Sequence, residues 1–139
     1  MGLIKALLRS EYGDEPFILI KDPRVCVLAP LWQRALVEAG YRPAYVVPTR
    51  NPLEVARSLE ARGDMAVPEG LALWLTYMER VEAFADTADA DFAHVRYTDL
   101  LDDWRQAVAR IAATLRVPLA VERDPAAVDD FLEGALRNP

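Results

Sequence analysis

The sequence predicts an α/β domain built from an open parallel sheet with flanking helices. Three short apolar runs alternate with longer segments in which apolar residues recur every three or four positions. Strands buried in a parallel sheet are continuous apolar runs, and the helices that cover such a sheet have the longer period. Proline and glycine lie between the segments and indicate where each element begins and ends.

The elements of the first third follow from this pattern in order. Apolar residues at helical spacing predict helices over residues 3–12 and 28–39, and Gly40 is typical of a residue that ends a helix. Between them, the apolar run 17–20 is bounded by prolines and predicts a central strand. The apolar run 44–49 predicts the next strand.

Helices and one more strand fill the rest of the chain. Asn51 followed by Pro52 is typical of an N-cap and the first turn of a helix. The remaining predicted elements are that helix over 52–62, a loop over 63–70, a helix over 71–85, a strand over 92–97, a helix over 100–115 that Pro118 ends, and a last helix that begins at Asp124 and Pro125.

The composition limits the classes of function. A chain of 139 residues, 53% of them hydrophobic, is expected to form one domain over residues 1–139 with a buried core. Its net charge of -6 argues against nucleic acid and anionic membranes as partners. One cysteine and one histidine leave no basis for an internal disulfide or a metal site rich in these residues, so no metal is expected. The sequence contains no recognisable signal peptide or membrane-spanning run, which makes the cytoplasm the expected location.

Arg50 and Ser58 form the most informative pair in the chain. Arg50 directly follows the predicted strand 44–49, where backbone N–H groups and the positive end of the next helix dipole favour a phosphate. Ser58 lies seven residues after Asn51, close to two helical turns, so its hydroxyl returns to the same helix face. Arginine donors and a serine hydroxyl can therefore converge on one anion. In the alternative interpretation, Arg50 pairs with a carboxylate and Ser58 is a surface residue of the helix.

The stretch AYVVPTRNPLEVARSLEAR resembles the 3′-phosphate-binding segment of sulfotransferases that use 3′-phosphoadenosine 5′-phosphosulfate (PAPS). Likewise, ILIKDPRVC resembles the family strand that carries a lysine, and HVRYTDLLDDW resembles its late strand, tyrosine and helix. The three segments occur in the family's order and cover most of the chain. The resemblance implies a sulfotransferase fold of the P-loop nucleotide-hydrolase type. It also implies PAPS as the donor and transfer of a sulfuryl group to a hydroxyl acceptor, with carbohydrate as one candidate class.

The resemblance also implies roles for five residues. Arg50 and Ser58 would bind the 3′-phosphate, and Tyr97 would stack on the adenine or hydrogen-bond to it. Lys21 would place positive charge near the transferred group, with a solvated lysine at a strand end as the alternative. Asp22 is the nearest group able to take a proton where many relatives carry a histidine. An Asp-Pro pair also starts turns for purely local reasons, which is the alternative for Asp22.

The predicted site collects at one edge of the sheet. Lys21, Arg50 and Tyr97 each lie at or just past the end of a predicted strand, where ligands of open α/β sheets bind. Arg24 is interpreted either as an anion ligand or as the partner that fixes Asp22 by a salt bridge.

One element of the family has no counterpart here. No basic residue is followed by Gly-Ser or Gly-Thr, as expected in the N-terminal loop that wraps the 5′-phosphosulfate. The chain therefore resembles a sulfotransferase without its first βα unit, and we expect an exposed apolar edge on its sheet.

Three functions follow from these observations. The first is PAPS-dependent sulfotransfer, with the missing loop supplied by a second chain or domain. The second is a noncatalytic relic or interaction module of the same fold, which pairs through its open sheet edge with a complementing chain or as a homodimer. The third, ranked last, is a kinase-like phosphotransferase, for which the phosphate loop and an obvious magnesium-binding aspartate are both lacking.

Overall fold

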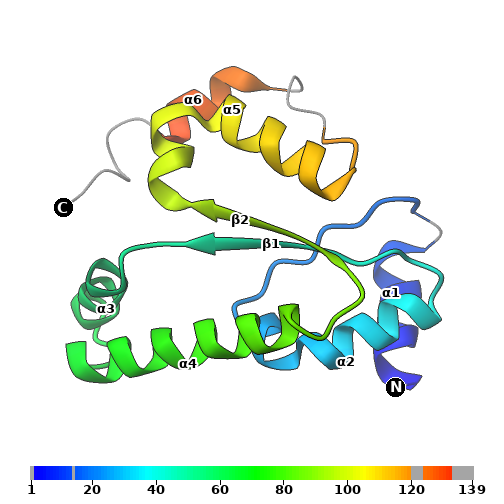
Figure 1. The fold of residues 1–139 in the computed structure, drawn as a ribbon, viewed down its shortest axis with the longest axis horizontal. Helices are drawn as coiled ribbons and strands as arrows, with labels where there is room; N and C mark the ends of the chain where they lie inside the picture. The colour runs from blue at the N-terminus through cyan, green and yellow to red at the C-terminus, as the bar shows by residue number, and fades with distance from the viewer. Residues whose placement is uncertain (1, 14, 120–123, 133–139) are drawn as a thin grey trace. The chain divides into compact units, whose positions relative to one another are not determined.

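The computed structural model describes residues 2–13, 15–119 and 124–132 (Figure 1). The chain divides into two compact units, Met1–Pro43 with Leu75–Ala90, and Ala44–Trp74 with Asp91–Pro139. The single domain expected from the sequence stays a prediction. Within the described ranges, no helix combines the length and the apolar character needed to cross a bilayer.

The first unit is helical. It contains α1 (Gly2–Tyr12), α2 (Val25–Glu38) and the second half of α4 (Val67–Ala85). Gly40 adopts φ 91° just after α2, and the Tyr41 N–H donates to the Leu36 carbonyl at 2.9 Å. This left-handed glycine ends the helix as predicted.

Residues 17–20 do not form the predicted central strand. They have no regular secondary structure, and the side chains of Phe17 and Leu19 are exposed. A strand is stabilised by its hydrogen-bonded neighbours, and the sheet of the described residues has two strands, neither of which includes this run. The prediction here was wrong, and the placement of Lys21 at the end of a strand was wrong with it.

The second unit contains a two-stranded parallel sheet. Strands β1 (Ala44–Thr49) and β2 (Asp91–Arg96) pair in register, so that Thr49 lies opposite Arg96. Helix α3 (Pro52–Ala61) follows β1 and helix α5 (Tyr97–Leu115) follows β2, so both helices begin at the carboxyl edge of the sheet (Figure 1). The predicted α/β class with parallel pairing and flanking helices is confirmed for these two strands. Tyr97, predicted to end the last strand, is instead the first residue of α5.

The core of this unit lies between the sheet and α5. Ala93 and Val95 alternate along β2 and face the same side. Ala107, Ile111 and Leu115 recur every fourth residue on one face of α5 and pack against them. The two periods match those expected of a strand and of a helix that each bury one face.

Asp103 divides α5 into two arms. Its backbone is extended, at φ -153° and ψ 84°, and its carboxylate accepts a hydrogen bond of 3.0 Å from the Gln106 N–H. Asp103 is therefore the N-cap of the longer second arm, and the short first arm turns away from it (Figure 1). Two residues of the second arm, Trp104 and Arg105, each donate to Asp129 of α6 (Pro125–Leu132) at 2.7 Å, which fastens α6 to α5.

Helices α3 and α4 contact at a glycine that the sequence placed in a loop. Helix α4 begins at Val67, so Gly70 lies within its first turns. A Cβ atom on Gly70 would lie 2.9 Å from the Ala56 Cα, and Ala56 is fully buried. The close approach therefore fixes α3, the helix that carries Ser58, against the start of α4.

Replacing Gly70 with leucine is expected to separate the two helices. The added side chain meets backbone at Ala56, and overpacking of this kind costs about 1–3 kcal/mol. The upper part of this range applies, because the contacted atom is backbone and cannot move aside as a side chain can. Better helix propensity offsets about 1 kcal/mol, so we expect a net loss of about 1–2 kcal/mol in the free energy of unfolding in urea. Ala72→Leu adds a comparable side chain at an exposed position of the same helix and should change stability by less than about 0.5 kcal/mol. Equal effects of the two substitutions would contradict this contact.

Candidate functional site

Arg50 and Tyr97 meet at the carboxyl edge of the sheet. Their neighbours Thr49 and Arg96 are paired across β1 and β2, which places the two strand-to-helix junctions side by side. The Arg50 guanidinium carbon lies 4.6 Å from the centroid of the Tyr97 ring, a cation–π contact. The Arg50 side chain is 31% exposed. Two of the residues predicted to bind a nucleotide are therefore brought together.

The start of α3 has the capping chemistry that the sequence predicted. The Asn51 side chain accepts a hydrogen bond of 2.9 Å from the Leu53 N–H, and Pro52 occupies the first helical position. The helix end beside Arg50 is thus well defined, and its dipole adds a partial positive charge there.

Glu54 forms an ion pair with the Arg50 guanidinium. The Arg50 Nε–H donates to Glu54 Oε2 at 2.9 Å, which joins residues one helical turn apart. Glu54 was not among the predicted site residues, although its spacing of four from Arg50 is the usual spacing of a helical ion pair. An anion that binds Arg50 must displace this carboxylate or share the guanidinium with it.

Ser58 lies one further turn along the same face of α3. Its rise from Pro52 is about 9 Å along the helix axis, and the residue is exposed. Since Arg50, Glu54 and Ser58 are spaced by four, Glu54 stands between the two residues predicted to hold one phosphate. The structure thus contains both features of the alternative interpretation, an Arg50–carboxylate pair and a serine on the helix surface.

Removing the Glu54 charge is expected to strengthen anion binding at Arg50. Glu54→Gln takes away an ion pair worth about 0.2–1 kcal/mol and the repulsion between a carboxylate and a phosphate. We expect the affinity for 3′-phosphoadenosine 5′-phosphate (PAP), measured by calorimetry, to rise about two- to tenfold. Glu60→Gln removes the same charge near the other end of α3 and serves as the control, with a change of less than about twofold. Weaker binding in Glu54→Gln would mean that Glu54 positions Arg50 for the ligand.

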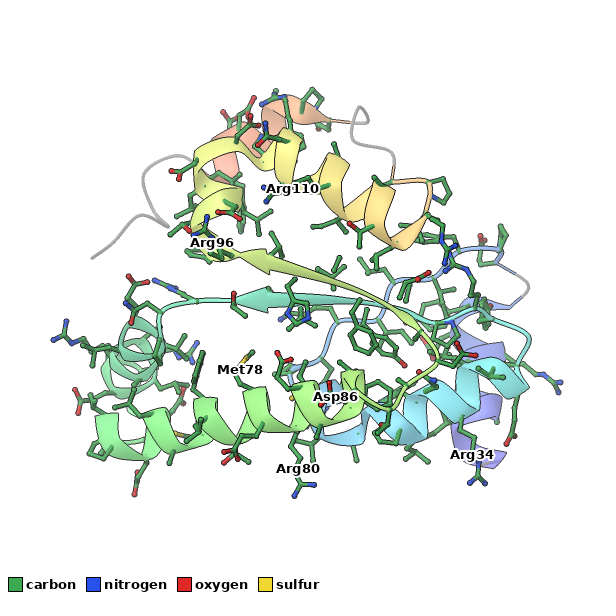
Figure 2. The ribbon with its side chains drawn as sticks, in the orientation of Figure 1. Arg34, Met78, Arg80, Asp86, Arg96 and Arg110 are labelled. Carbon is green, nitrogen blue, oxygen red and sulfur yellow. The ribbon has the colours of Figure 1, made fainter. Side chains whose placement is uncertain are left out.

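A second cationic group lies at the same edge. Asp99, in the first arm of α5, accepts from Arg96 through Oδ1 at 2.8 Å and from Arg110 through Oδ2 at 3.0 Å. Figure 2 labels the two arginines, one at the end of β2 and one on α5. The hydrogen bond from Arg96, followed by that from Arg110, holds the pKa of Asp99 below its usual value despite partial desolvation. Asp99 therefore anchors two arginines, neither of which was among the predicted site residues.

Lys21 and Asp22 belong to the first unit. Arg24 donates to both carboxylate oxygens of Asp22, from Nη2 at 2.6 Å and from Nε at 2.9 Å, and also from its backbone N–H at 2.8 Å. This bears out the salt bridge considered for Arg24 and the local turn considered for the Asp-Pro pair. These hydrogen bonds lower the pKa of Asp22 to about 2. A carboxylate of such low pKa is a weak base, so the geometry adds no support for Asp22 as the proton acceptor. The catalytic roles of Lys21 and Asp22 stay predictions.

Comparison of the chain with protein-family models, with curated proteins and with solved structures gives no match. The function therefore has to be argued from the residues at the carboxyl edge. In chemical terms these residues offer guanidinium and backbone N–H donors, one aromatic ring and a serine hydroxyl. Within the described part of the chain, no three His, Cys, Asp or Glu side chains gather as metal ligands do.

Proposed function

We propose that this protein has a sulfotransferase-like fold and binds the nucleotide of PAPS at the carboxyl edge of its sheet, with the 3′-phosphate on Arg50. The family activity would be transfer of a sulfuryl group to a hydroxyl acceptor. The observation that carries the proposal is the contact between Arg50 and Tyr97 at the junctions where α3 and α5 begin. It joins an anion-binding group to an aromatic ring, the two kinds of group that a phosphorylated nucleoside needs.

The donors at this edge fit a phosphate. Arg50 gives its Nε–H to Glu54, and a guanidinium carries four further N–H donors in a fork that matches phosphate oxygens. With Arg50 on one face of the Tyr97 ring, an adenine would stack on the opposite face or hydrogen-bond to the hydroxyl. Ser58 would contribute only to a ligand that reaches past Glu54 along α3.

The chemistry of transfer places further demands on the protein. PAPS supplies an activated sulfuryl group, and the protein has to hold the nucleotide, stabilise the charge that grows on the leaving phosphate and take a proton from the acceptor. Arg50 and Tyr97 are the residues proposed to hold the nucleotide. For the other two demands Lys21 and Asp22 stay sequence-based predictions, and the Arg24 salt bridge, which lowers the pKa of Asp22 to about 2, makes Asp22 a weak base.

Titration of the chain with PAP in a calorimeter tests this proposal. We expect one site per chain with a dissociation constant on the order of micromolar. PAP is the stable product of the donor, so binding is measured without turnover. Absence of PAP binding up to millimolar concentrations would contradict the proposal.

A second candidate is an interaction module that pairs through the edge of its sheet. One observation favours it: Val46 of β1 is exposed, and in the sheet of the described residues each strand has a single neighbour. Unpaired strand edges with apolar side chains are sites of association between chains. Sedimentation of the wild type and of Val46→Lys tests this candidate, which requires a dimer that the lysine dissociates.

A further inference from the structure

We propose that the nucleotide's second anionic group, its 5′-phosphate, is bound by Arg96 at the end of β2 and by Arg110 on the second arm of α5, which Asp99 of the first arm holds together. This inference rests on the proposed function, because it assumes a nucleoside 3′,5′-bisphosphate whose 3′-phosphate is on Arg50. In the sulfotransferases that the chain resembles, a glycine-containing loop with a basic residue binds the 5′-phosphosulfate, and this sequence contains no such loop.

Arg96 lies at the same edge of the sheet as Arg50. Arg96 is the last residue of β2 and lies opposite Thr49, the residue before Arg50. Neighbouring strands are about 4.8 Å apart, so the junctions that carry Arg50 and Arg96 are adjacent. Arg96 also directly precedes Tyr97, whose ring contacts the Arg50 guanidinium. One small ligand can therefore reach both cationic groups.

Asp99 and its two partners, Arg96 and Arg110, form a positively charged group. One carboxylate holds two guanidiniums, at 2.8 Å from Arg96 and 3.0 Å from Arg110, so the group keeps a net positive charge. The Asp99 side chain is 19% exposed, while those of Arg96 and Arg110 are 76% and 55% exposed. The acid thus lies beneath the arginines and orients them, and the surplus charge faces solvent. Arginine pairs held in this way suit a phosphate, because both forks are fixed before the ligand arrives.

The kink in α5 brings Arg110 to Asp99. Asp99 and Arg110 are eleven residues apart, and in a straight helix they would be separated by about 16 Å. The break at Asp103 turns the first arm so that the Arg110 guanidinium donates to the Asp99 carboxylate. An unbroken helix would leave Arg110 away from the edge. The kink therefore adds a second arginine to the site, in a chain whose net charge is -6.

The test separates the two phosphates of the ligand. Arg110→Gln and Arg96→Gln are titrated with PAP and with adenosine 3′-monophosphate, which lacks the 5′-phosphate. We expect each variant to weaken PAP binding about five- to thirtyfold and to leave binding of the 3′-monophosphate unchanged within about twofold. Arg62→Gln is the control, because Arg62 is an exposed arginine paired with an aspartate at the far end of α3. It should alter neither titration by more than about twofold.

The outcomes distinguish this inference from the function on which it rests. If Arg50→Ala weakens PAP binding while Arg110→Gln and Arg96→Gln do not, the assignment of the 5′-phosphate is overturned and the proposed function stands. Equal weakening for both nucleotides would also overturn it, since the arginines would then act on the 3′-phosphate or at a distance. A wild-type chain that binds no PAP would overturn both proposals. Circular dichroism of each variant identifies any loss of folding.

Discussion

The Arg50→Ala variant is expected to bind PAP about 10- to 150-fold more weakly than the wild type. Charged hydrogen bonds of the kind that a guanidinium makes to a phosphate contribute about 1.5–3 kcal/mol, which converts to this range. The loss should be large because the Arg50 side chain is mostly buried and held against Tyr97 and Glu54, so its place is fixed before binding. Calorimetric titration of both proteins under the same salt conditions measures the difference.

Two variants make this result specific. Arg50→Lys keeps the charge but loses the fork and the flat contact with Tyr97, so we expect an intermediate affinity. Arg62→Ala removes an exposed arginine from the opposite end of α3 and should leave the affinity within about twofold of the wild type. A loss in Arg62→Ala as large as that in Arg50→Ala would indicate that binding depends on the charge of the whole chain.

The Ile111→Ala variant is expected to lose about 2–5 kcal/mol in the free energy of unfolding. Ile111 is 7% exposed and packs in the cluster that joins α5 to Ala93 and Val95 of β2. Truncation leaves a cavity in the apolar cluster between α5 and β2, which contains few large side chains that could fill it. Urea unfolding followed by circular dichroism measures the loss.

The matched control lies three residues along the same helix. Thr114 is exposed, and Thr114→Ala removes a similar β-branched shape without opening the core. Its stability should stay within about 0.5 kcal/mol of the wild type. Similar changes in the two variants would mean that Ile111 contributes no more packing than an exposed residue, and the core described for this unit would be wrong.

The elements that were predicted well depend on neighbours in sequence. Residues 44–49 form a strand, Asn51 caps α3 and Gly40 ends α2, and in each case the signal and the structure lie within a few residues of one another. The apolar run 17–20 has an equally strong local signal, yet it forms no strand. Strand formation requires a partner elsewhere in the chain, and composition cannot supply that information.

In the candidate site, too, some contacts could be predicted from the sequence and others could not. The meeting of Arg50 and Tyr97 follows from two strand ends on parallel strands, so it was predictable once the strands were known. The bond between Asp99 and Arg110 was not predictable without the kink at Asp103. Apolar residues at helical spacing on both sides of Asp103 concealed the break. The one signal of the break in the sequence was Asp103 itself, an aspartate whose carboxylate can cap a helix by accepting from the N–H three residues later, here that of Gln106.

The measurement that tests the central claim most directly is a thermodynamic cycle between Arg50 and the 3′-phosphate. The wild type and Arg50→Ala are each titrated with PAP and with adenosine 5′-monophosphate, which lacks only the 3′-phosphate. If Arg50 binds that phosphate, its loss weakens PAP about 10- to 150-fold and changes the affinity for the monophosphate by less than about twofold. Equal weakening for both nucleotides would place Arg50 elsewhere on the ligand and contradict the assignment of the 3′-phosphate to this edge of the sheet.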